Sequence, residues 1–547
     1  MIGNDSSFNL VSEPWIRTQD IDGAERLVSL SELFAMSQHL RTVLGDTAAQ
    51  SFAITRVLLA IVRRAVEWGE RPIARWQSIW ESGSFPTEQI TGYLDRFHRR
   101  FDLLDSVEPF YQVADLATAK AEFRPVELLL EDVPTGEKYF TTRVGPGTES
   151  LSLAEAARWL IHCQAYDISG IKSGDPRDPR TKGGKGYPIG VGWVGQLGGV
   201  LLEGENLFQT LMMNTVASDT DGNGPDEDDL PVWEMPHPDC CERDLLVPTG
   251  PADLLTWQSR RIRLVVGDGQ VRSVLIANGD PLDSHNRFRD ELMTSWRFSE
   301  PQSKKFGEDR FLPMQWDPDR VLWRGIEGLL GYRPAESGPR PGPIAAGSVH
   351  WVERLFADDV LAANTRVRIH AYGLEYINQS SFVRAAVDDA LSMSIAVLEH
   401  NGDACTQACQ AVERAVKAVR ALGVLSFRLA RAAGGDGVSD RASAEADGYF
   451  ALDGHYRHWL GQLSDTPDAD HRADWDKAVR RVVEPFAKEL LENAGEVAWI
   501  GRENHGQWGE FKGAWLDSAV AESAFRRALI NAIPRAYEES DSKSEAK

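Results

Sequence analysis

The stretch Tyr-Ile-Asn-Gln-Ser-Ser-Phe-Val at residues 376–383 marks the point at which the sequence pattern changes. Before it, apolar side chains alternate over residues 367–371, as they do in a half-buried strand. After it, the Asn and Ser side chains can cap a helix whose apolar residues begin at Phe382, and every later candidate element is helical. We therefore expect a domain boundary here, with a mixed domain over residues 1–378 and a helical domain over residues 379–547.

The second domain carries several helical candidates. One carries an apolar stripe and ends at Gly434-Gly435, and others span about residues 444–463, 470–491 and 515–533. Pro485 lies inside the third of these segments, where its ring and its missing N–H should kink or divide the helix.

The first domain mixes helices with strands, so the predicted fold class is α+β. Residues 47–68 and 153–163 are predicted to be helices, and Arg56, Arg63 and Arg64 in the first of them are expected to be solvated rather than functional. Strand-like residues on either side of Gly267-Asp268-Gly269 predict a β-hairpin. Arg272 follows its turn and could extend away from the sheet, although a solvated strand arginine is the plainer interpretation.

Length and composition bound the class of protein. A chain of 547 residues exceeds the usual size of one hydrophobic core, so at least two domains are expected. The formal net charge of −23 argues against non-specific coating of nucleic acid and confines any DNA contact to local basic patches. Five cysteines without C-x-x-C spacing, no signal-peptide pattern and no long apolar run favour a soluble cytoplasmic protein without a membrane partner.

Residues 169–199 form a glycine-rich basic segment with ten glycines and five basic residues against two aspartates. Glycine lets the backbone approach a ligand closely, and Arg and Lys side chains attract phosphates. A nucleic-acid contact and a mobile, solvated loop are both consistent with this composition.

Several shorter patterns are weak. Residues 190–195 match the dinucleotide pattern G-x-G-x-x-G, but no buried strand precedes them. Residues 219–224 copy only the first half of a calcium loop. Three further groups could suggest a metal, but a plain loop, core packing or a solvated face explains them better: His237 with Cys240 and Cys241, Cys405 with Cys409, and His455 with His458. We find no catalytic constellation and expect no cofactor and no metal.

Five segments occur in an order that resembles the CasA family, the large subunit of the type I-E CRISPR Cascade complex. They are residues 8–16, Glu108-Pro109-Phe110, residues 170–174, Trp257-Gln258 and residues 373–380. The resemblance covers nearly the whole chain and implies a large mixed N-terminal domain followed by a C-terminal four-helix bundle. The sequence departs from the family where Ser169 and Ile171 replace glycines, and where Cys240 and Cys241 cannot reproduce the four-cysteine zinc site of some members.

The resemblance also implies roles for particular residues. A loop at Ser169, Gly170, Ile171 and Lys172 would read a short motif in the DNA minor groove. Asn378 and Gln379 would form a wedge that starts strand separation. The remaining implied contacts are a basic finger at Arg272, contacts to the DNA backbone or displaced strand at Arg177, Arg180, Lys182 and Lys185, and a subunit or RNA contact loop at Arg143, Val144, Gly145, Pro146 and Gly147.

The function implied is recognition without chemistry. By this resemblance the chain would recognise the protospacer-adjacent motif in double-stranded DNA, open the duplex for the CRISPR RNA, stabilise the displaced strand and recruit a helicase-nuclease, beside other Cascade subunits. Two alternatives are a nucleotide-binding enzyme that uses the Gly/Lys-rich segment and a purely structural scaffold subunit.

Overall fold

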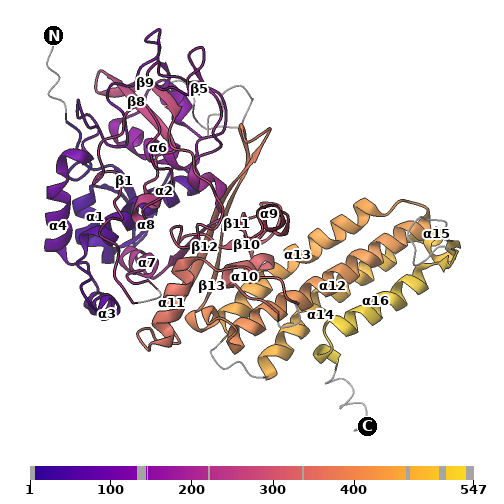
Figure 1. Ribbon diagram of the computed structural model, residues 1–547. Helices are drawn as coiled ribbons and strands as arrows, with labels where there is room; N and C mark the ends of the chain where they lie inside the picture. Colours follow the sequence, from indigo (N-terminus) through magenta and orange to yellow (C-terminus); the bar gives the residue numbers. More distant parts are fainter. Residues whose placement is uncertain are drawn as a thin grey trace. The chain divides into compact units, whose positions relative to one another are not determined.

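The computed structural model describes residues 7–131, 143, 146–219, 222–334, 338–463, 469–503 and 513–537. The chain divides into two compact units (Figure 1). The first comprises residues 1–318, 337–360 and 367–390, and the second comprises residues 319–336, 361–366 and 391–547. The helix-and-sheet composition confirms the predicted α+β class. In the part of the chain that the structure describes, no helix combines the length and apolarity that a membrane crossing requires.

Helix α2 is buried along most of its length and packs against four other helices of the first unit, α4, α6, α7 and α8. Thr47 caps it by accepting a hydrogen bond from the backbone N–H of Gln50 at 3.2 Å, as the predicted helix over residues 47–68 requires. The helices described in this unit are α1 (Leu30–Met36), α2 (Ala48–Ala65), α3 (Pro72–Ser82), α4 (Thr87–Arg96), α5 (Pro146–Glu149), α6 (Leu153–Tyr166), α7 (Leu207–Asn214), α8 (Pro251–Leu255), α9 (Glu300–Phe306) and α11 (Gly347–Ala357).

The strands of the first unit form small antiparallel sheets. The strands are β1 (Ile16–Asp20), β2 (Glu25–Val28), β3 (Leu40–Leu44), β4 (Arg124–Pro125), β5 (Lys172–Ser173), β6 (Lys185–Gly186), β7 (Gly199–Glu203), β8 (Arg260–Gly267), β9 (Gln270–Asn278), β10 (Trp296–Phe298), β11 (Phe311–Pro313), β12 (Arg366–Ile377) and β13 (Phe382–Ser394). Three-stranded sheets have the orders β2-β1-β3, β4-β9-β8 and β13-β12-β7, while β5 pairs with β6 and β10 with β11. The predicted hairpin around Gly267-Asp268-Gly269 is confirmed as β8 and β9.

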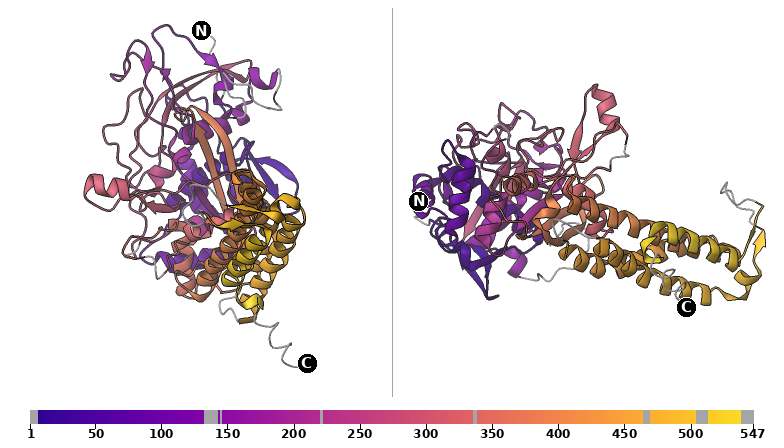
Figure 2. Two further views of the ribbon diagram at one scale, coloured as in Figure 1. Left: turned by 90° about the vertical axis from the view of Figure 1, so that its right-hand side faces the viewer. Right: turned by 90° about the horizontal axis from the view of Figure 1, so that it is seen from below.

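The helix predicted from Phe382 is wrong, because this segment is strand β13. Asn and Ser side chains suit tight turns as well as helix caps, and here they join β12 to β13. The resulting long hairpin is drawn in orange in Figure 1 and can be followed in the left view of Figure 2. The predicted boundary at residues 378/379 thus falls in a turn inside the first unit, and β13 continues along the chain into the second.

The second unit is built on a bundle of four long helices, α12 (Asp403–Ala433), α13 (Val438–Gly461), α14 (Ala469–Glu492) and α16 (Ser518–Ala532). Buried alanines along α12 allow close packing. The indole of Trp475 donates to the carbonyl of Ala411 at 2.9 Å and anchors α14 to α12. Pro485 does not divide α14, because the buried side chains of Val483 and Ala487 pack the helix on both sides of it. Shorter elements are α10 (Ile326–Leu330), α15 (Gly495–Ile500), β14 (Arg502–Glu503) and β15 (Trp515–Leu516).

Candidate nucleic-acid interface

The loop at Ser169 and the turn of the β12–β13 hairpin lie side by side, although they are far apart in sequence. The backbone N–H of Ser169 donates to the carbonyl oxygen of Ser380 at 2.8 Å. Asn378, Gln379 and Ser380 have φ angles of 52°, 59° and 62°, so three consecutive residues adopt the left-handed conformation. The side chains of Asn378 and Gln379 are exposed. The two segments predicted to read the motif and to wedge the duplex therefore form one surface.

Asp167, at the end of α6, holds the predicted motif-reading loop in place. Its carboxylate contacts Lys172 Nζ and Arg260 Nε, each at 2.5 Å. Burial would raise the pKa of Asp167, but the charges and hydrogen bonds of Lys172 and Arg260 lower it below its usual value. Lys172 is therefore engaged inside the protein. The parts of the loop left open are the Ile171 side chain, 58% exposed, and Gly170, where a Cβ would meet no atom within 4 Å.

A cavity of about 930 Å³ opens beneath this surface. The loop at Ser169 and the hairpin residue Phe382 line its rim, and Lys185 lines another side. His162 and Tyr166 of α6 line it too, with their rings stacked at a centroid distance of 5.2 Å. Lysines and glutamates both line the cavity, so its lining is of mixed charge.

Arg177 and Arg180 are held by aspartates of their own segment. Arg177 pairs with Asp175 at 2.7 Å, and Arg180 pairs with Asp178 at 2.9 Å. Arg180 also donates to Glu242 and to backbone carbonyls near the end of β9. Both arginines anchor the glycine-rich segment to the first unit, and their contact with a displaced strand stays a prediction.

Unlike Arg177 and Arg180, Lys182 and Lys185 flank an exposed turn. Gly183 and Gly184 have φ angles of 59° and 76°, and the backbones of the two lysines hydrogen-bond each other at 3.0 and 3.2 Å. The strands β5 and β6 lead into and out of this region. Both lysine side chains are exposed, and within the described ranges neither of them forms an ion pair. They are thus available to a phosphate.

The other two predicted contact points lie elsewhere in the first unit. Arg272, half-exposed, contacts the exposed Asp268 at 3.1 Å beside the β8–β9 turn. Arg143 is largely buried, donates to Glu155 at 2.6 Å and lies over the ring of Trp159. Of the remaining residues in its loop, Val144 and Gly145 lie outside the described residues, while Pro146 and Gly147 begin α5. Their contact roles stay predictions.

The weaker patterns have structural explanations. Gly192 packs on α6, since a Cβ there would lie 2.4 Å from the carbonyl oxygen of Ala165. A 3-10 turn follows it at residues 193–196, not the helix that a dinucleotide site requires. In the calcium-like segment, residues 220 and 221 lie outside the described residues. Among the residues that the structure does describe, no three His, Cys, Asp or Glu side chains gather as a metal site.

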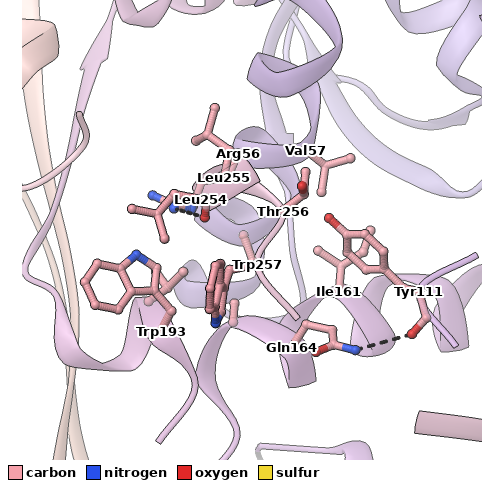
Figure 3. Close-up of a pocket in the computed structure, with 13 residues that line it drawn as sticks. Arg56, Val57, Tyr111, Ile161, Gln164, Trp193, Leu254, Leu255, Thr256 and Trp257 are labelled. Carbon is pink, nitrogen blue, oxygen red and sulfur yellow. Dashed lines mark hydrogen bonds between the residues drawn. The ribbon is translucent and has the colours of Figure 1, made fainter. Parts of the chain in front are cut away.

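A buried ion pair between Arg56 and Glu291 contacts Trp193 of the glycine-rich segment. Figure 3 shows Arg56 and Trp193 among the residues that line a small pocket. Arg56 donates both terminal nitrogens to the carboxylate of Glu291 at 2.8 Å, and the Trp193 indole donates to the same carboxylate at 2.7 Å. Arg56 is 1% exposed, so the expectation that it is solvated is wrong. Arg56 lies four residues after Phe52 and three before Leu59, so the helical spacing places it on the apolar face of α2 and could have indicated its burial. Its partner Glu291, in a distant loop, could not be located from that spacing.

Comparisons with known proteins agree with this architecture. A family model described as CRISPR-associated protein Cse1 matches residues 9–485. The crystal structure of Cse1 from Thermobifida fusca is 40% identical, with a TM-score of 0.89 over 98% of this chain and 100% of that one. Cse1 from Acidimicrobium ferrooxidans is 28% identical, with a TM-score of 0.78 over 97% and 99% of the two chains. The chain belongs to the CRISPR-associated protein Cse1 family.

A curated relative, CasA/Cse1 of Thermus thermophilus, is 27% identical over 364 residues, which span 65% of this chain and 64% of that protein. A chain of a structure titled CRISPR RNA-guided surveillance complex is 16% identical, with a TM-score of 0.60 over 89% and 98% of the two chains. The fold is therefore shared with a chain of such a complex.

Proposed function

We propose that this chain is the non-catalytic large subunit of a CRISPR RNA-guided surveillance complex and that it reads a short motif in double-stranded DNA. Its partners would be other Cascade subunits, the CRISPR RNA, the target duplex and a helicase-nuclease. Membership of the Cse1 family and the fold shared with a chain of a surveillance complex support the class of assembly. The geometry of the site supports two roles for this chain, motif reading by the loop at Ser169 and duplex opening by Gln379.

The hydrogen bond between Ser169 and Ser380 carries this proposal, because it joins the loop that would read the groove to the turn that would act as the wedge. Gly170 offers bare backbone with open space above it. The minor groove displays a degenerate pattern of acceptors, so a backbone reader would accept several related motifs. The base pair next to the motif would then meet the turn of the hairpin.

Gln379 suits the wedge for two reasons. Its amide can donate and accept hydrogen bonds, so it can replace contacts that a base pair loses without desolvating a charge. Its place in a run of three left-handed residues at the end of a hairpin limits the freedom of the turn. Entry into a duplex requires a long, uncharged side chain on a turn with little conformational freedom.

The test is duplex binding by a complex reconstituted with this chain, on a target with a cognate adjacent motif and on the same target with the motif scrambled. Discrimination that disappears when this subunit is omitted supports the proposal. Equal binding of both targets contradicts motif reading. Strand opening is followed in parallel with 2-aminopurine beside the motif.

The wedge is tested with Gln379→Met, which keeps length and removes the amide. Opening should slow by about tenfold or more, since hydrogen bonds that form as bases separate lower the barrier, while motif binding is retained. Asn401→Ala is the matched control, because Asn401 is also an exposed amide in the left-handed conformation. Normal opening by Gln379→Met would remove the wedge assignment.

A purely structural subunit is the second candidate. The internal pairing of Lys172, Arg177 and Arg180 favours it, since these cations already serve the fold. A scaffold predicts that the complex assembles only with this chain, yet binds cognate and scrambled targets equally.

A further inference from the structure

Three charged side chains connect the strands of the sheet that carries the hairpin. His370 of β12 lies between Glu203 of β7 and Asp388 of β13. Its Nδ1 is 2.9 Å from Glu203 Oε1, and its Nε2 is 2.5 Å from Asp388 Oδ1. We call these residues the three-strand cluster. One imidazole thus joins both neighbours of the central strand.

Further groups of the first unit complete the surroundings of His370. Tyr372, two residues along β12, stacks on the imidazole at 4.1 Å and places its hydroxyl 2.9 Å from Nδ1. Arg368, two residues before it, contacts Glu203 at 3.3 Å. Residues at this spacing share one face of the strand. From α2, the apolar ring of Phe52 stacks on Tyr372. His370 and Glu203 are nearly buried, whereas Asp388 is more than half exposed.

We propose that His370, in its protonated form, is a positioning residue that fixes β12 and β13 to β7 and so orients the turn bearing Gln379. This inference rests on the proposed function, because it assigns the support of the wedge. His370 acts through Gln379 and does not itself contact DNA. Other contacts of the hairpin are the exposed Arg384–Glu375 pair nearer its turn and the hydrogen bond that the Tyr376 hydroxyl donates to the carbonyl of Tyr166 at 2.8 Å.

The chemistry of imidazole makes this support depend on pH. A protonated ring donates from both nitrogens and satisfies both carboxylates, whereas a neutral ring donates from only one. Burial would lower the pKa of His370, but its hydrogen bonds to Asp388 and Glu203 raise it above the usual value of about 6.5. The stabilisation is therefore complete below that value and is lost as pH rises through the folded-state pKa.

The first arm of the test uses the full chain without DNA. Hydrogen exchange of β13 amides, corrected for intrinsic rates, is measured by mass spectrometry between pH 6 and 9. Protection should fall by about tenfold as His370 loses its proton, since one charge-assisted hydrogen bond disappears. The step should vanish in His370→Gln and shift to lower pH in Asp388→Asn. His350→Gln, which alters an exposed histidine with one nearby carboxylate, is the control.

A β13 step that persists unchanged in both cluster variants, or no step at all, overturns the inference. Asp388→Asn keeps this test valid if His370→Gln fails to fold, because the Asp388 side chain is 58% exposed.

The second arm measures strand opening by the reconstituted complex over the same pH range. Opening, but not motif binding, should fall with pH in the parent protein and become independent of pH in His370→Gln. Identical profiles for the two proteins, with Gln379→Met still defective, overturn the positioning role and leave the wedge intact. Normal opening by Gln379→Met removes the wedge assignment and the positioning role together, whereas the exchange step in the first arm does not depend on the wedge.

Discussion

The hydrogen bond from the Ser169 backbone N–H to the Ser380 carbonyl oxygen joins the loop after α6 to the turn between β12 and β13. Both partners are backbone groups, so the contact persists whatever side chains occupy these positions. A displacement of the loop therefore moves the turn, and a displacement of the turn moves the loop. Motif reading and duplex entry are mechanically linked if both occur here.

Gly170 is expected to matter for duplex approach and not for folding. Gly170→Ala places a methyl group in open space, so the free energy of unfolding should change by less than about 1 kcal/mol. Affinity for the cognate duplex should fall by about tenfold, because the methyl group would stand between backbone and groove. Thermal unfolding and duplex binding check both parts. Gly454→Ala, also at a position without neighbours within 4 Å, is the control, and equal affinities of the two variants would contradict the prediction.

Lys182 and Lys185 are expected to contact phosphates. Replacing both with alanine should weaken duplex binding at low salt and reduce the slope of log affinity against log salt by roughly two, since each lost phosphate contact changes it by about 0.9. Titrations at several salt concentrations measure the slope. The control replaces Lys417 and Lys488, exposed lysines of the bundle. An unchanged slope in the Lys182/Lys185 variant would show that these lysines do not contact DNA.

Asp175 is expected to make the first unit sensitive to acid. Its hydrogen bonds with the Arg177 side chain, together with backbone N–H donors, lower its pKa far below the usual value. The unfolded chain thus binds a proton that the folded chain does not, so this contribution is complete above about pH 4 and is lost as pH falls further. Urea unfolding at pH 3 and pH 5 should show a smaller loss in Arg177→Ala than in the parent. Equal losses would mean that the pair does not couple to folding.

The buried Arg56–Glu291 pair predicts a non-additive effect on stability. Arg56→Ala leaves the Glu291 carboxylate buried without its cation and should cost about 3–5 kcal/mol. Replacing both residues with methionine should cost less than the sum of the single replacements, because no unpaired charge remains. Urea unfolding of the single and double variants tests this. Strict additivity would contradict the assignment of a coupled pair.

Local patterns in the sequence predicted much of the fold. The β8–β9 hairpin follows from alternation around a glycine turn, and the end of α12 follows from Gly434, which has a φ angle of 101°. Strand β13 was missed because its sequence contains several alanines and aspartates, which favour strands poorly. The segment forms a strand because it pairs with β12, and local strand propensity carries no information about that pairing.

The candidate site was predictable only in part. The resemblance located Ser169 and Gln379, and the structure shows that their segments adjoin. The repeated Asp-Pro-Arg spacing at residues 175–180 could have indicated that both arginines pair internally. Nothing local could reveal the cavity or the three-strand cluster, since Glu203, His370 and Asp388 meet only through the register of the sheet.

The three-strand cluster fixes one end of the hairpin, so the number of residues in its strands sets how far the turn lies from the cluster. His370 of β12 and Asn378 of the turn are eight residues apart, roughly 27 Å at the usual rise of a strand. Two residues added to each strand would lengthen this reach by roughly 7 Å and leave every side chain on its own face. One residue added to each strand would turn over the part of the hairpin between the insertion and the turn, so that its side chains would lie on the opposite face of the sheet. The length of the hairpin is therefore fixed in steps of two.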